Sequence, residues 1–82
     1  MAIQINQIAT QALSQMDDAE DAIVNALNEG RTLGLNEAQD LLNQANSEYS
    51  NGNYAQALNL ATRAATKAEE AEAPLSAEDE TS

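Results

Sequence analysis

Few side chains in this sequence are suited to catalysis or to metal binding. The chain has no histidine and no cysteine, so the usual proton shuttle and the commonest nitrogen and sulfur metal ligands are absent. The densest group of carboxylates is Asp17, Asp18, Glu20 and Asp21. This run lacks the glycine and the alternating oxygen ligands of a calcium-binding loop. Because these acids would point around a helix, the pattern favours a solvated face over a metal-responsive protein, which stays as an alternative.

Nucleophilic catalysis also has no support in the sequence. Serine, threonine and tyrosine are present, but no base stands beside any of them. Gly30, Gly34 and Gly52 lie at expected helix boundaries and form no phosphate-binding loop. We therefore predict a non-enzymatic protein with no catalytic residue, no cofactor and no metal site.

The composition indicates one small domain with a thin core. The chain has 82 residues, of which 43% are hydrophobic, and it contains no phenylalanine or tryptophan. Much of the apolar content is alanine, which buries little surface per residue. A protein partner or a second copy of the chain is therefore expected to complete the core.

The net charge of −11 argues against nucleic acid and anionic membranes as partners, because both require a basic face. Such acidity fits a strongly solvated surface, or a salt-rich habitat such as that of a halophilic archaeon. No apolar run is long enough to insert into a membrane, and the first residues do not resemble a signal peptide. We expect a cytoplasmic protein if Met1 is the native start, and a cell-surface protein if the chain is an excised module.

Hydrophobic periodicity predicts a first helix over residues 5–29. The residues spaced alternately by four and three are Ile5, Ala9, Ala12, Met16, Ala19, Ile23 and Ala26. Ile8, Leu13, Ala22 and Leu27 widen this line into a stripe that would face two neighbouring helices. Gly30 should end the helix in the left-handed conformation, and Leu33 and Leu35 should both turn inward.

Two further helices are predicted over residues 37–50 and 54–73. Asn36 and Asn53 should cap them, with Gln39 and Gln56 completing capping boxes. The corner between them is Tyr49, Gly52 and Tyr54, where the two tyrosines either pack in a wedge or form part of a peptide-binding groove.

Pro74 should stop the last helix, and residues 74–82 read as a disordered acidic tail or linker. The predicted architecture is an all-α, antiparallel up-down-up three-helix bundle over residues 1–73, in which the third helix packs against the other two.

The second predicted hairpin resembles a known repeat. Leu41 and Ala45, then Gly52, Tyr54 and Ala57 at the corner, then Ala61 and Ala64 match a single tetratricopeptide-type hairpin over residues 38–65. Similar hairpins occur in microtubule-interacting-and-transport domains and in helical modules of prokaryotic surface proteins. The resemblance implies binding of peptides or helices, or a scaffold role, and no enzymatic activity. The long first helix has no counterpart in these repeats.

We therefore expect a structural or protein–protein interaction module within a surface or multidomain assembly. Ile3, Ile5, Ile8 and Leu60 are the candidate partner face, provided that packing leaves them exposed. The first alternative is a self-associating bundle that forms a homo-oligomer.

Overall fold

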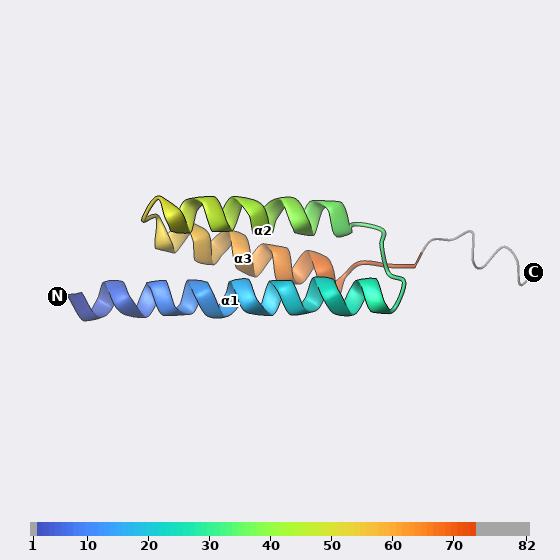
Figure 1. The fold of residues 1–82 in the computed structure, drawn as a ribbon, viewed down its shortest axis with the longest axis horizontal. Helices are drawn as coiled ribbons and strands as arrows, with labels where there is room; N and C mark the ends of the chain where they lie inside the picture. Colours follow the sequence, from blue (N-terminus) through green and yellow to red (C-terminus); the bar gives the residue numbers. More distant parts are fainter. Residues whose placement is uncertain (1, 74–82) are drawn as a thin grey trace, which may run out of the picture.

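The computed structural model describes residues 2–73, with side chains from Gln7 onward, and it places three helices side by side (Figure 1). They are α1 (Ala2–Asn28), α2 (Leu35–Ser50) and α3 (Tyr54–Glu69). Short connections make consecutive helices antiparallel. α3 contacts both other helices far more extensively than α1 and α2 contact each other. The predicted up-down-up bundle is confirmed, whereas the predicted tail and Pro74 lie outside the described residues.

The core of the bundle consists mainly of alanine. The larger buried apolar side chains among the described residues are Ile23, Leu35 and Leu60. At the middle of the bundle, Ala19 of α1 meets Ala64 and Ala65 of α3. Small side chains on both sides of such an interface allow the helix backbones to approach closely. The alanine lines expected from the sequence are therefore where the helices meet.

The connection from α1 to α2 begins with the predicted left-handed glycine. Gly30 has a φ of 75°, and its amide donates to the Leu27 carbonyl at 3.1 Å. The next amide, of Arg31, donates to the Ala26 carbonyl at 2.7 Å. These two bonds form a Schellman motif, which satisfies carbonyls that the end of α1 would otherwise leave unpaired.

The start of α2 differs from the sequence prediction. Gly34, with a φ of 93°, occupies the N-cap position in place of Asn36, no side chain caps the helix, and the helix begins at Leu35. Starting there places Leu35 on the same face as Ala38, and Leu35 is only 4% exposed. Burial of one leucine therefore determines where the helix begins, and the predicted capping box at Asn36 is wrong.

Leu33 and the end of α3 also differ from the prediction. Leu33 was expected to turn inward with Leu35, but its side chain is 48% exposed. Its backbone instead pairs with Glu72, with N–H to carbonyl distances of 2.9 and 3.2 Å in the two directions. Glu70 keeps helical dihedral angles as the C-cap, and the chain leaves the helix beyond it to reach this pairing, so α3 ends at Glu69, four residues before the predicted residue 73.

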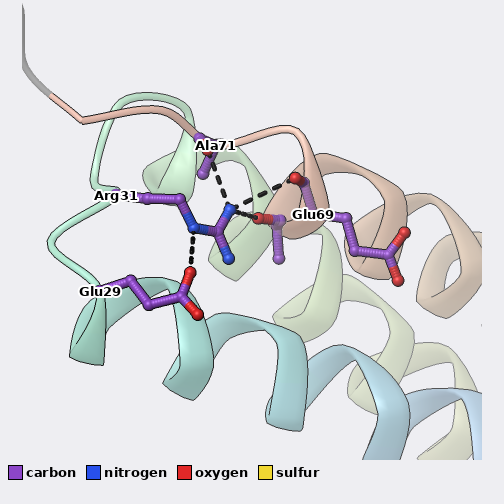
Figure 2. Close-up of polar contacts among 5 residues, drawn as sticks. Glu29, Arg31, Glu69 and Ala71 are labelled. Atoms are coloured by element: carbon purple, nitrogen blue, oxygen red, sulfur yellow. Dashed lines mark hydrogen bonds and ion pairs between the residues drawn. The ribbon is translucent and has the colours of Figure 1, made fainter.

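Arg31 completes this end of the bundle (Figure 2). Its Nη1 donates to the carbonyls of Ala68 and Glu69 at 3.3 Å each, and to that of Ala71 at 2.9 Å. Its Nε donates to Glu29 Oε1 at 2.6 Å. The guanidinium thus supplies donors to the terminal carbonyls of α3 and places a positive charge at the negative end of the helix dipole.

The corner between α2 and α3 repeats the Schellman geometry. Gly52 has a φ of 87°, and its amide donates to the Tyr49 carbonyl at 3.0 Å. The amide of Asn53 donates to the Glu48 carbonyl at 2.8 Å. Asn53 is at the predicted N-cap position of α3, but its Nδ2 donates to Glu48 Oε1 at 2.7 Å and its side chain makes no capping bond. The predicted capping box with Gln56 is therefore wrong.

Replacing Gly52 by valine should destabilise the fold by about 1–2 kcal/mol, because a β-branched residue tolerates positive φ poorly. No heavy atom lies within 4 Å of the position of an added Cβ, so backbone conformation and not a clash sets this effect. Chemical unfolding in urea measures it. Gly52→Asn is the control and should lose less, since asparagine enters the left-handed region more readily. Equal losses in the two variants would contradict this explanation.

Arg31→Met should lower the free energy of unfolding by about 1–2 kcal/mol, because the carbonyls at the end of α3 lose a charged donor. Methionine retains the apolar stem of the side chain. Arg63→Met makes the same change of charge at an exposed position of α3 and should remain within about 0.5 kcal/mol of the parent. Comparable losses for the two variants would show that net charge, and not capping, accounts for the effect.

Candidate functional site: the exposed face of α1

The two tyrosines at the corner contact each other. The ring centroids of Tyr49 and Tyr54 lie 4.9 Å apart, with an angle of 57° between the ring planes. Both residues are half-buried where α2 ends and α3 begins. The contact is of the kind a packing wedge would have, and Tyr54 also lines an open hollow beside the corner, so the wedge and the peptide-binding groove both stay predictions. Gly52 lies between the two tyrosines in the chain and provides the turn that brings their rings together.

Beside this corner, α1 extends past the α2–α3 hairpin (Figure 1). Its 27 residues span about 40 Å, against about 24 Å for each 16-residue partner helix. The resulting step contains an open hollow of about 560 Å³, which is lined by Ile8 and by residues 52–56.

The four residues predicted for the partner face have different outcomes. Ile8 is exposed at the step, as that prediction required. Leu60 is buried against Ala45 and Ala61 and therefore presents no partner surface, which corrects its inclusion. The side chains of Ile3 and Ile5 lie outside those that the structure describes.

Exposed large apolar side chains are unevenly distributed over the described residues. They are Ile8, Leu13, Val24 and Leu27 on α1, and Leu33 in the loop that follows. Leu13 and Leu27 were expected to widen the buried stripe, but they are 48% and 50% exposed. That prediction is wrong because α1 packs chiefly on α3, and this leaves the adjoining side of α1 open.

Three of these exposed residues, Leu13, Val24 and Leu27, fall on a second line along α1, which we call the outer stripe. Its members are Leu13, Asp17, Glu20, Val24 and Leu27. They repeat the alternate spacing of four and three, one position after the core line of Ala12, Met16, Ala19, Ile23 and Ala26. One position corresponds to about 100° around the helix, so the outer stripe flanks the core. Val24 is absent from the apolar stripe predicted for the first helix, although it continues this repeated spacing.

A groove separates the outer stripe from α2. It contains a hollow of about 170 Å³, whose walls are Leu13, Met16, Asp17 and Glu20 of α1 and Leu42 and Asn46 of α2. Leu42 and Met16 are half-buried there. The lining of this hollow is therefore mixed: Leu13, Met16 and Leu42 are apolar, Asn46 is polar, and the charged groups are carboxylates.

The chain's basic residues lie elsewhere. Arg31 is engaged at the end of α3. Arg63 and Lys67 line a hollow between α2 and α3, where Lys67 Nζ lies 3.5 Å from Glu37 Oε1. Asp18 and Asp21 belong to a third hollow, between α1 and α3, on the side opposite the groove. Among these three hollows, only the one between α2 and α3 is lined by more basic than acidic residues.

The described residues contain no group of three or more histidine, cysteine, aspartate or glutamate side chains arranged to hold a metal ion. The run from Asp17 to Asp21 divides between two faces of α1, because Asp17 and Glu20 border α2 while Asp18 and Asp21 border α3. Within residues 2–73, no helix has the length and apolar character needed to cross a membrane.

Comparison with known proteins finds no matching family model, no matching curated protein and no matching solved structure. The resemblance of residues 38–65 to a tetratricopeptide-type hairpin therefore stays a prediction.

Proposed function

We propose that this chain is a non-enzymatic protein-interaction module whose binding face is on α1. The observation that carries this proposal is the concentration of exposed large apolar side chains on one helix. Single exposed leucines are ordinary on protein surfaces, whereas apolar side chains aligned at helical spacing are typical of a contact with another helix.

The packing of the bundle gives this arrangement a physical reason. The interior between α1 and α3 is narrow because alanines meet there, so larger side chains beside the core line have no space to enter. Leu13, Val24 and Leu27 remain half in water, which is unfavourable by roughly 25 cal/mol for each Å² of apolar surface left exposed. A partner that covers them would recover this free energy.

The outer stripe would also serve a homo-oligomer, which is the second candidate function. Association of two chains that each carry a charge of −11 is opposed by repulsion, which salt screens. Sedimentation velocity at two protein concentrations, each with and without added salt, tests this candidate. An increase in sedimentation coefficient with concentration, larger in salt, would support a homo-oligomer. A monomer under every condition would exclude it.

Substituting glutamine at Leu13, Val24 and Leu27 together should leave the bundle folded, with a loss of less than about 2 kcal/mol in unfolding free energy. The expectation follows from exposures of 48–50% for these side chains. Urea unfolding followed by circular dichroism measures the loss.

The matched control is Ile23→Gln on the core line of the same helix, where the side chain is 6% exposed. This single substitution should cost about 3 kcal/mol or more, because it buries an amide among apolar neighbours. If the triple variant were as unstable as the control, the outer stripe would be part of the folding core, and the proposed function would fail.

A further inference from the structure

We propose that the groove between α1 and α2 binds a basic amphipathic helix. This inference rests on the proposed function and names the class of partner. The occupant would bring an apolar stripe to meet Leu13, Val24 and Leu27, and lysine or arginine side chains to meet Asp17 and Glu20.

The outer stripe has the length of a helix contact, and the hollow of the groove lies at its Leu13 end. Leu13 and Leu27 are fourteen positions apart on α1, which corresponds to about 21 Å, or roughly four turns of a helix lying alongside. The hollow of about 170 Å³ near Leu13 is comparable to a cavity of ~150 Å³ that admits benzene, so it can receive one large apolar side chain. The least extensive helix contact in the bundle, between α1 and α2, leaves this face open.

Charge determines which amphipathic helix fits. Asp17 and Glu20 occupy the middle of the outer stripe, between Leu13 on one side and Val24 on the other. The α2 wall of the hollow contributes Leu42 and Asn46, neither of which is charged. A partner with carboxylates at the facing positions would be repelled, whereas one with ammonium or guanidinium groups would form ion pairs at the edge of an apolar contact.

A second copy of this chain matches the groove poorly. A symmetric pairing of outer stripes would place Asp17 and Glu20 of one copy against the same acids of the other. Arg63 and Lys67 lie on the face between α2 and α3, away from the outer stripe. A symmetric dimer would therefore bring no basic side chain against Asp17 and Glu20, whereas a separate basic helix would.

Titration with two synthetic peptides tests the inference. Each is an amphipathic helix of about sixteen residues with one face of leucines, flanked by lysines in the first peptide and by glutamates in the second. Fluorescence anisotropy of the labelled peptides gives the affinities, and amide chemical shifts of the isotope-labelled protein locate the binding. We expect the lysine peptide to bind, to weaken as salt is added, and to shift resonances of the outer stripe and of α2 around Leu42. The glutamate peptide should not bind.

Two double variants with the same net charge provide the matched comparison. Asp17→Asn with Glu20→Gln removes two charges from the groove, and Asp18→Asn with Asp21→Asn removes two from the opposite side of α1. The first pair should weaken the lysine peptide roughly three- to tenfold, as expected for two exposed ion pairs, and the second pair less than about twofold.

Each opposing result is distinct. Equal weakening by the two double variants would overturn the inference, because attraction would then follow net charge and not the groove. Equal binding of the two peptides would overturn the claim that the partner is basic, while an apolar interaction face on α1 would remain supported. If neither peptide binds, and the triple glutamine variant at Leu13, Val24 and Leu27 is stably folded, the inference about the groove is overturned while the proposed function is not. A dimer strengthened by Asp17→Asn with Glu20→Gln, and not by Asp18→Asn with Asp21→Asn, would overturn the inference and assign the groove to a second copy.

Discussion

Close approach of helix backbones across alanine is the constraint on which the rest of this structure depends. Ala19, Ala64 and Ala65 meet where α1 and α3 pack, and Ala45 and Ala61 are buried with Leu60 nearer the corner. Such contacts leave little volume for larger side chains, so Ile8, Leu13, Val24 and Leu27 of α1 lie outside the core, whereas Ile23 is buried within it. The thin interior and the apolar outer surface of α1 are consequences of one packing choice.

Because alanine burial provides limited hydrophobic stabilisation, the ends of the helices need polar contacts of their own. Two Schellman motifs satisfy carbonyls at the ends of α1 and α2. At the end of α3, the Arg31 guanidinium reaches carbonyls across the bundle, and Leu33 pairs with Glu72 close by. The first loop and the segment after α3 therefore hold each other in place (Figure 2).

Local signals in the sequence predicted the parts of the fold that local physics controls. The alternating spacing through Ala12, Ala19 and Ala26 predicted the buried face of α1, and all three are fully buried. Gly30 and Gly52 marked helix ends, because a left-handed residue there is readily recognised. Contacts between distant residues could not be predicted in this way. Arg31 lies 37 to 40 positions from the carbonyls it binds, so no spacing rule indicated that α3 would end at Glu69.

The candidate site was predicted only in part, for a related reason. Periodicity showed that α1 carries more apolar residues than one interface needs, but it could not decide which side of the core line a neighbouring helix would cover. Leu60 was a candidate for the partner face and is buried, because it packs with Ala45 and Ala61 in the core. Leu13 and Leu27 looked like core residues and are half-exposed, because the gap between α1 and α2 stays open.

The up-down-up order also has a mechanical consequence. The described chain enters the bundle at one end of its long axis and leaves it at the other, with α1 and α3 running in the same direction (Figure 1). Tension applied between these two ends would act along the helix axes and load the alanine interfaces in shear. Many small contacts would then resist together, in contrast to a hairpin whose adjacent ends are pulled apart one contact at a time.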